Sequence, residues 1–548
     1  MNQIKVTSNG KTASYPYGTR VNEILKESDG KYPVVAVLVN NELTSLSYKI
    51  ETNAEVKPIY PDDPRGARVY RRSLSFLLAM ASSEIFSSRL IISHSIGNGY
   101  YYYLEDNSEI TDKDIEILEN KMNSLVQKAL PIYRRKISYT DAVNYFKEHG
   151  RDNRVLLMEF RNESKIPIYQ CDSFWDMSFD PLVPNTSLLS HFELKKYETG
   201  LLLRYPHTAT PMQMAEMKDN PLLYSIYSEY KAWGKILDID SVGKLNKKIA
   251  ERDIQPFIRV AESLHNKKIS EIADRIHDRK GQVKTVLIAG PSSSGKTTFT
   301  KKLGIQLRVL GFNPQIIGLD DYFVPRTRTP RDAEGNYDFE CLEAIDVELL
   351  NQNLMDLFSG KEVEIPTYDF KTGTRKYTGN MLKMEDRNIL LMEGIHGLNA
   401  NLTPLVKPEQ KYQIFISALT QLNIDDSNRI ATTDNRLLRR IIRDHQFRGH
   451  DALTTLRMWN SVKNGEKKNI FPFQNNADSA FNSALDYELA VLKPYAEPLL
   501  KQVKPWDDEY AEAMRMLNFL NNFLPLPVKH VPMDSILREF IGDSGFKY

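Results

Sequence analysis

The chain has 548 residues, of which 41% are hydrophobic and 26% are charged, a composition typical of globular proteins. At roughly 150 residues per domain, this length predicts three or four domains rather than a single core. The 72 Lys and Arg residues nearly balance the 71 Asp and Glu residues, so any anionic partner must be bound by a local basic patch.

The sequence predicts a cytoplasmic protein without a disulfide framework. Its two cysteines, Cys171 and Cys341, are far apart and form no C-x-x-C pair, which also disfavours a zinc site built from thiolates. The start, MNQIKVTSNGK, lacks the basic and then apolar pattern of a signal peptide. No apolar run approaches the ~18 residues that a membrane-spanning helix needs, so we expect no membrane partner.

The first half of the chain is predicted to form two domains and a connector. Residues 1–62 alternate short β-rich runs (QIKVTS, VVAVLV, EVKPIY) with a small helical piece, VNEILKES, which is typical of a β-grasp domain. Residues 63–237 predict an α+β domain, with a helix over RRSLSFLLAMASSEIF and strands over GYYYYLE and RVLLMEF. Charged, helix-favouring sequence over 238–281 predicts a helical connector.

The second half is predicted to be α/β. Over residues 282–495, apolar strands (KTVLIAG, PQIIGLD, NILLMEG, YQIFIS) alternate with helical stretches, which predicts a parallel sheet with helices on both faces. Residues 496–548 predict a helical tail.

One motif lies between a predicted strand and a predicted helix, where GPSSSGKT matches G-x-x-x-x-G-K-[ST]. Its small residues allow backbone N–H groups to surround a polyphosphate, and the helix N-terminus adds its positive end. Lys296 is expected to reach the β- and γ-phosphates, and the Thr297 hydroxyl to hold Mg²⁺. This context disfavours a chance Gly/Ser loop. The predicted ATP-binding residues here are Gly290, Pro291, Ser292, Ser293, Ser294, Gly295, Lys296, Thr297 and Thr298.

Three carboxylates follow predicted strands and are expected at the carboxyl edge of the sheet. Asp320 and Asp321 come after QIIGL, and Glu393 ends ILLME. Open α/β sheets bind ligands at this edge. One aspartate is placed to orient an acceptor hydroxyl and take its proton, and Glu393 to reach a metal shell. Each alone would more often be a helix cap or a solvent-facing group, but the neighbouring P-loop favours the catalytic interpretation.

The segment RLLRRIIRDHQFR predicts a helix with one strongly basic face. At 100° per residue its apolar residues fall on one side and four arginines on the other, namely Arg436, Arg439, Arg440 and Arg443. Such a face is usually only solvated. Guanidinium groups also suit the charge spread over phosphoryl oxygens, and beside a P-loop we favour a phosphate clamp.

Residues from about 283 to 492 resemble the uridine–cytidine kinases, which belong with the phosphoribulokinases among P-loop kinases. The resemblance rests on ordered motifs: GPSSSGKTT, LDDYF, NYDF, IPTYDF, LMEGIHG and RRIIRDHQFRG. It implies a nucleoside kinase that transfers the γ-phosphoryl group of ATP to a 5′-hydroxyl, with ATP and Mg²⁺ as cofactors.

The resemblance also implies a role for each matching position. Asp320 is expected to be the catalytic base, and Thr297 and Glu393 the magnesium ligands. The implied catalytic residues are Asp320, Lys296, Arg440 and Arg443. The implied substrate-binding residues are Asp338, which binds the ribose, with Tyr368, Phe323, Arg440 and Arg443. Arg448 is expected to contact ATP from the lid.

Three positions depart from the family pattern. Gly373 stands where a base-reading histidine is common, Phe323 where a tyrosine is common, and His450 where a lid arginine is expected. Losing polar groups that read a base widens the acceptor range or moves it away from pyrimidine nucleosides. A sugar or sugar-phosphate kinase therefore stays open as an alternative.

The front half resembles the N-terminal regions of threonyl-tRNA synthetases, with a TGS-like domain over 1–62 and an editing-like domain over 63–237. The editing family carries H-x-x-x-H and C-x-x-x-H motifs. The corresponding positions here are Arg72, Phe76, Ser178 and Leu182. Hydrolysis by that constellation and a zinc site are therefore not expected, and the fold can persist as a binding or assembly module.

A third possible function is an RNA- or tRNA-binding regulator that uses the P-loop as a nucleotide switch. The tyrosine run from Tyr100 to Tyr103 could stack on RNA bases, although such a run more often packs in a core, which we favour. The balanced charge and the acceptor-side motifs also weigh against RNA. A nucleoside substrate is predicted, and a homo-oligomer stays open.

Overall fold

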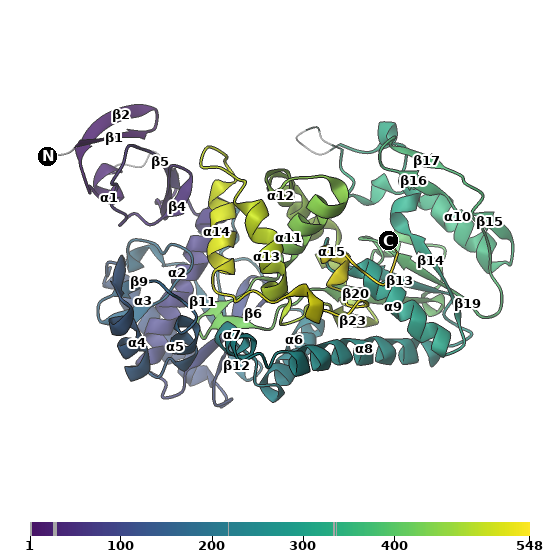
Figure 1. Ribbon diagram of the computed structural model, residues 1–548, viewed down its shortest axis with the longest axis horizontal. Coiled ribbons are helices and arrows are strands. Elements are labelled where there is room, and N and C mark those ends of the chain that lie inside the picture. Colours follow the sequence, from purple (N-terminus) through teal and green to yellow (C-terminus); the bar gives the residue numbers. More distant parts are fainter. Residues whose placement is uncertain (1–2, 26–29, 218, 332–334, 336, 548) are drawn as a thin grey trace. The chain divides into compact units, whose positions relative to one another are not determined.

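The computed structural model describes residues 3–25, 30–217, 219–331, 335 and 337–547 (Figure 1). The chain divides into two compact units. The first comprises Met1–Asp253, Gln421–Ile430 and Glu497–Pro525, and the second comprises Ile254–Thr420, Ala431–Ala496 and Leu526–Tyr548. The units cut across the predicted linear boundaries, because both the connector and the tail are shared between them. None of the described helices is both long and apolar enough to cross a membrane.

The first unit begins with a five-stranded sheet in the order β2-β1-β5-β3-β4. Its strands are β1 (Gln3–Ser8), β2 (Lys11–Pro16), β3 (Ala36–Val39), β4 (Glu42–Thr44) and β5 (Ala54–Ile59). β1 and β5 are parallel, and the other pairs are antiparallel. Alternation along β1 buries Ile4 and Val6 in the core, as period-2 patterning requires. The predicted strands are confirmed; the predicted helix starts with α1 (Val21–Ile24), and residues 26–29 lie outside the described residues.

Two antiparallel sheets and several helices form the rest of this unit. The sheets have the orders β11-β12-β7-β6 and β10-β9-β8. Their strands are β6 (Leu90–Ile96), β7 (Gly99–Leu104), β8 (Tyr133–Ser138), β9 (Lys165–Cys171), β10 (Phe174–Asp176), β11 (Glu193–Tyr197) and β12 (Gly200–Arg204). The helices are α2 (Pro64–Ser83), α3 (Asp112–Gln127), α4 (Tyr139–Glu148), α5 (Asp152–Met158), α6 (Pro221–Ile236), α7 (Val242–Ala250) and α14 (Tyr510–Leu520), and a short hairpin is formed by β21 (Asn423–Asp425) and β22 (Asn428–Arg429).

The helix predicted over RRSLSFLLAMASSEIF is confirmed as part of α2, which starts with Pro64 after the N-cap Asp63. The strand predicted over RVLLMEF is wrong, because this run forms α5. A short apolar run does not distinguish a strand from a buried helix by periodicity alone. The tyrosine run packs as we favoured: Tyr101 and Tyr102 are buried in β7, and the Tyr102 hydroxyl donates to Ser75 Oγ at 2.9 Å.

The second unit is built on a parallel sheet in the order β14-β19-β13-β20-β23 (Figure 1). Its strands are β13 (Thr285–Ala289), β14 (Asn313–Gly318), β19 (Asn388–Glu393), β20 (Lys411–Ser417) and β23 (Ser479–Asn482). Two further hairpins pair β15 (Glu362–Glu364) with β18 (Met381–Lys383), and β16 (Thr367–Asp369) with β17 (Thr374–Lys376). The helices are α8 (Gln255–His277), α9 (Lys296–Val309), α10 (Val347–Phe358), α11 (Thr432–Arg443), α12 (Ala452–Asn469), α15 (Arg538–Ile541) and most of α13 (Glu488–Leu500), whose residues from 497 onward belong to the first unit.

Helices cover both faces of this sheet, which confirms the predicted α/β class. On β19, Leu391 lies against Gly304 of α9, whereas Leu390 and Met392 share a core with Leu350 of α10. Because the five strands are parallel, their carboxyl ends lie along one edge. The P-loop follows β13, the two aspartates follow β14, and Glu393 ends β19. The topology therefore brings the predicted catalytic groups to neighbouring positions.

Candidate active site

The loop between β13 and α9 has the backbone conformation that a phosphate cradle needs. Ser293 and Gly295 adopt positive φ angles of 59° and 83°. A Cβ atom at Gly290 would lie 2.1 Å from the carbonyl oxygen of Ile416, so a larger residue does not fit there. Lys296 Nζ donates to the Gly290 carbonyl at 2.9 Å, and burial lowers its pKa against the opposing effect of nearby carboxylates. The lysine therefore lies over the loop that is expected to bind the phosphates of a nucleotide.

The magnesium pair expected from the sequence is brought into direct contact. Thr297 Oγ1 donates to Glu393 Oε1 at 2.9 Å and lies 3.2 Å from Oε2. Burial raises the pKa of Glu393 to about 7, whereas the Lys296 charge opposes the shift. A hydroxyl and a carboxylate are oxygen ligands of the kind that Mg²⁺ takes beside a nucleotide. These two residues therefore fit the ion.

The two aspartates that follow β14 have different surroundings. Asp320 is exposed to solvent on one side. The protein atoms around its carboxyl desolvate it in part and raise its pKa, whereas the charge of Lys296 opposes this shift. Asp321 Oδ1 instead accepts a hydrogen bond from the backbone N–H of Tyr368 at 3.2 Å. Asp320 is thus the aspartate available to a substrate, and Asp321 positions the hairpin that carries Tyr368.

The four arginines of α11 do not form one basic face. Arg436 and Arg439 are fully buried, and they donate to the backbone carbonyls of Ser292 and Ser293 at 3.1 and 3.3 Å. Their ion-pair partners, both at 2.5 Å, are Glu466 and Glu488. The prediction that all four arginines clamp phosphate is therefore wrong for these two, which hold the P-loop in shape. Helical periodicity correctly put them on a polar face. That face is buried, because α12 and α13 pack on it and provide the carboxylates of Glu466 and Glu488.

The other arginines of this segment are less buried than Arg436 and Arg439. Arg440 Nη1 donates to Ser292 Oγ at 2.8 Å, and its Nε lies 3.1 Å from Asp444. Arg448 lies 3.2 Å from the same carboxylate and is half-exposed. Burial lowers the pKa of Arg443 to about 10, and the charge of Arg448 adds to this shift. Arg440, Arg443 and Arg448 therefore remain the arginines expected to contact a polyphosphate.

An aromatic wall lies beside Asp320, formed by Phe323, Phe339, Tyr368 and Phe370. The ring of Phe323 lies 5.6 Å from that of Tyr368 and 5.5 Å from that of Phe339, both edge to face. Tyr368 and Phe370 are 5.1 Å apart. Asp338, the predicted ribose ligand, accepts from the backbone N–H of Glu340 at 3.0 Å.

The space beside Gly373 is filled by another residue. Gly373 has a φ of 67°, and a Cβ atom there would lie 2.7 Å from both Cβ and Nε of Arg326. The backbone N–H of Arg326 donates to the Gly373 carbonyl at 2.8 Å, and its guanidinium donates to the Phe370 carbonyl. Arg326 therefore takes the space that a longer side chain at position 373 would need. The sequence alone did not indicate this role of Arg326.

Two glutamates of the site were missed by sequence reasoning. Glu466 Oε1 accepts from the backbone N–H of Ser292 at 3.0 Å. Glu340 packs against α12, because a Cβ atom added at Gly465 of that helix would lie 2.7 Å from the Cβ atom of Glu340. Burial raises the pKa of Glu340 to about 7, and the neighbouring Glu466 adds to this shift. The only signal for Glu340 was its place directly after the NYDF motif.

We expect Glu340→Gln to change how the stability of the second unit depends on pH. When folding raises the pKa of a carboxyl, the group stabilises the folded protein at pH values below its pKa in the unfolded chain. This contribution is lost as the pH rises through its folded-state pKa, which is about 7 for Glu340. The free energy of unfolding of the native protein should therefore fall between about pH 4.5 and 7, relative to the variant, by about 2 kcal/mol. Denaturant titrations at several pH values measure this difference. The exposed neighbour Glu343→Gln serves as control, and equal pH profiles for native protein and Glu340→Gln would contradict the assignment.

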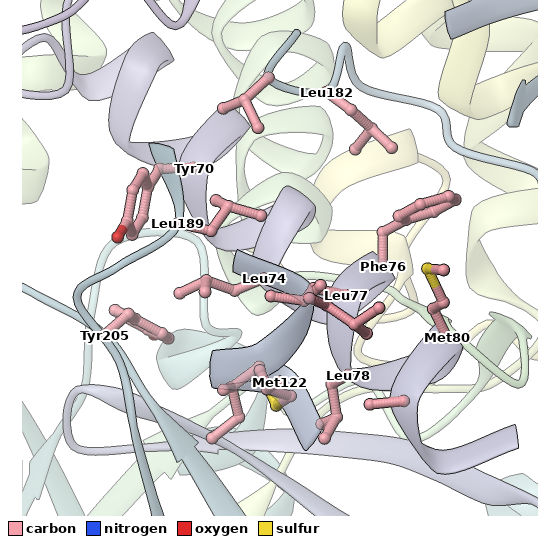
Figure 2. Close-up of a cluster of buried hydrophobic side chains, with 14 of the residues drawn as sticks. Tyr70, Leu74, Phe76, Leu77, Leu78, Met80, Met122, Leu182, Leu189 and Tyr205 are labelled. Carbon is pink, nitrogen blue, oxygen red and sulfur yellow. The ribbon is translucent and has the colours of Figure 1, made fainter. Parts of the chain in front are cut away.

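In the first unit, the four positions that were compared with an editing motif make structural contacts. Arg72 Nε donates to Ser178 Oγ at 3.2 Å, and its other nitrogens donate to the carbonyls of Met177 and Ser427. Phe76 and Leu182 point into an apolar cluster (Figure 2). Within the described ranges, no group of three or more His, Cys, Asp or Glu side chains is arranged to hold a metal ion.

The contact with Ser427 belongs to the segment Gln421–Ile430, which lies between β20 and α11 in the sequence but is part of the first unit. Arg154 Nη2 donates to Ser427 Oγ at 2.7 Å and lies 2.8 Å from Asp176. Asp425 lies 3.6 Å from Arg154 Nε. The segment therefore fills the region next to Arg72 and Ser178 with a buried polar network.

Residues 285–490 match the sequence model of the Phosphoribulokinase / Uridine kinase family. The N-terminal half is 28% identical over 232 residues to the threonine–tRNA ligase of Francisella tularensis subsp. novicida and 27% identical to that of subsp. holarctica, in both cases covering 42% of this chain and 34% of that protein. The chain thus spans about a third of the length of these curated relatives. The structure of a possible uridine kinase from Bacillus stearothermophilus is 18% identical, with a TM-score of 0.27, and covers 39% of this chain and 98% of that one.

Proposed function

We propose that this chain, whose residues 285–490 form a P-loop kinase domain of the phosphoribulokinase/uridine kinase family, phosphorylates the 5′-hydroxyl of a nucleoside with ATP. The observation that carries the proposal is the grouping at one sheet edge. There the P-loop lysine, the contact between Thr297 and Glu393, and the exposed residue Asp320 lie beside an aromatic wall. A phosphate cradle and a base next to an acceptor surface are the parts that phosphoryl transfer needs.

In the proposed mechanism, Asp320 orients the acceptor hydroxyl and receives its proton while the hydroxyl oxygen attacks the γ-phosphorus. The bond between that phosphorus and the bridging oxygen breaks, and ADP leaves with the electron pair. Lys296 and Arg440 stabilise the charge on the phosphoryl oxygens. When bound by Thr297 and Glu393, Mg²⁺ would neutralise charge on the β- and γ-phosphates. The protein thus supplies mainly position and electrostatic stabilisation.

The aromatic wall supports a nucleoside as the acceptor. Phe370, 56% exposed, offers a ring against which a base can lie, and the buried rings of Phe323 and Tyr368 support it. Asp338 is a suitable acceptor for ribose hydroxyls, as the family resemblance implies. Arg326 favours a second candidate, because a guanidinium beside Gly373 would suit an anionic acceptor such as a sugar phosphate. The two candidates differ in whether the acceptor carries an aromatic base or a negative charge.

An acceptor panel decides between them. The 548-residue chain is incubated with ATP, Mg²⁺ and uridine, cytidine, purine nucleosides, ribulose 5-phosphate or no acceptor, and the products are identified by mass. We expect a nucleoside 5′-monophosphate as the main product. A phosphorylated sugar phosphate with no nucleotide product would replace the nucleoside proposal with the second candidate. Lys296→Ala controls for contaminating kinases, because it removes the phosphate-binding amine.

A further inference from the structure

The end of the chain binds the same helix terminus that is expected to bind ATP. Glu539, in the short helix α15, accepts hydrogen bonds from the backbone N–H of Thr298 at 3.0 Å and from its hydroxyl at 2.8 Å. Thr298 lies in the first turn of α9, directly after the P-loop lysine and threonine. The side chain of Glu539 is only 7% exposed. A carboxylate therefore occupies one of the N–H groups that a P-loop offers to phosphate oxygens.

The surrounding tail holds this carboxylate in place. Phe540 is fully buried, and the guanidinium groups of Arg439 and Arg443 lie 4.9 and 5.9 Å from its ring centre. Ile536 lies so close to the P-loop that a Cβ at Gly295 would be 2.5 Å from its Cγ2. These contacts hold α15 against α11 and place Ile536 against the P-loop (Figure 1).

Glu539 also has a second cation within reach. Its other carboxylate oxygen lies 3.7 Å from Arg443 Nη1. A phosphate oxygen and the carboxylate cannot both accept from the Thr298 N–H without bringing two negative charges together in a poorly solvated place. Movement of the carboxylate from Thr298 towards Arg443 would remove this acceptor from the N–H group while the charge of Glu539 keeps a partner.

We propose that the C-terminal tail inhibits its own kinase site, with Glu539 competing with the phosphates of ATP for Thr298. The inference rests on the proposed function, since it takes the P-loop to be the ATP site. ATP binds when its phosphate displaces the carboxylate, so the affinity for ATP is lower than the P-loop alone would give. Anything that draws the tail away, such as a partner that binds residues 536–541, would raise that affinity.

The first test compares nucleotide binding by variants of the 548-residue chain, measured by calorimetry. Glu539→Gln and Glu539→Ala are expected to bind ATP and ADP about 10-fold more tightly than the native protein, since about 1.4 kcal/mol of competition is removed. Adenosine, which has no phosphate, should bind within about twofold of native. Asp543→Asn, a change of the same kind at an 86% exposed tail position, is the matched control and should leave ATP binding unchanged. ATP affinity within twofold of native, or weaker, in both Glu539 variants would overturn the proposal.

Hydrogen exchange of the native chain provides a test that does not depend on a variant's folding. Added ATP should slow exchange in residues 290–298 and speed it in residues 536–541. Protection of the P-loop with unchanged exchange in the tail would overturn the proposal and leave the ATP site intact. Absence of ATP binding by the native protein and by every variant would instead overturn the proposed kinase function, and this inference with it.

Discussion

Asp320→Asn should lower the turnover number by about 10²–10⁴-fold while ATP affinity stays within about twofold of native. The amide keeps the size of the carboxylate but cannot take the hydroxyl proton. Asp320 is exposed and its carboxylate interacts electrostatically with Lys296, so the loss should fall on turnover rather than on ATP binding. Steady-state kinetics with the best acceptor, together with calorimetry for ATP, separate the two quantities.

The neighbouring aspartate supplies a matched control. Asp321→Asn keeps an oxygen that can accept from the Tyr368 N–H, so it should retain at least about 10-fold more turnover than Asp320→Asn. The reverse ranking would assign the base to Asp321. Near-native turnover of Asp320→Asn with ATP bound would show that neither the position nor the pKa of Asp320 matters for proton transfer.

Arg154→Ala should destabilise the first unit by about 3–5 kcal/mol, because it leaves buried carboxylates without their cation. Arg154, Asp176 and Asp425 are all at most 1% exposed, and the arginine lies 2.8 and 3.6 Å from the two acids. Removing one member of a buried ion network lowers the free energy of unfolding strongly, because the remaining charges lose their partner. Replacing the whole network by apolar side chains has a much smaller effect. Thermal and denaturant unfolding measure the loss.

Arg135→Ala, at an exposed position of β8 in the same unit, is the control and should change stability by less than about 0.5 kcal/mol. A small effect of Arg154→Ala would show that water reaches Asp176 and Asp425. In that case the segment Gln421–Ile430 would not depend on this network for its place in the first unit.

Local patterns were sufficient to predict the framework of the site. The strands of the parallel sheet follow from apolar runs, and the parallel arrangement puts the ends of β13, β14 and β19 at one edge. That rule alone anticipates the contact between Thr297 and Glu393, although the two residues are far apart in the sequence. The P-loop was predictable because its motif fixes both residue type and spacing.

What the sequence could not give depends on contacts between distant segments. The helical period placed Arg436 with Arg440, yet only the packing of α12 shows that Arg436 is buried against Glu466. No motif connects Glu539 with Thr298, and no pattern places Ser427 beside Arg72. In each case a polar side chain is explained by a partner that local periodicity does not reveal.

The most direct test of the central claim measures ADP and phosphorylated acceptor in the same reaction. With the best acceptor and Mg²⁺, the 548-residue chain should form the two products in a one-to-one ratio. Without acceptor, ADP formation should be at least about 100-fold slower, because transfer to water lacks a positioned hydroxyl. ADP formed at the same rate without acceptor, and no phosphorylated product with any acceptor, would contradict the kinase account and indicate a nucleotide switch.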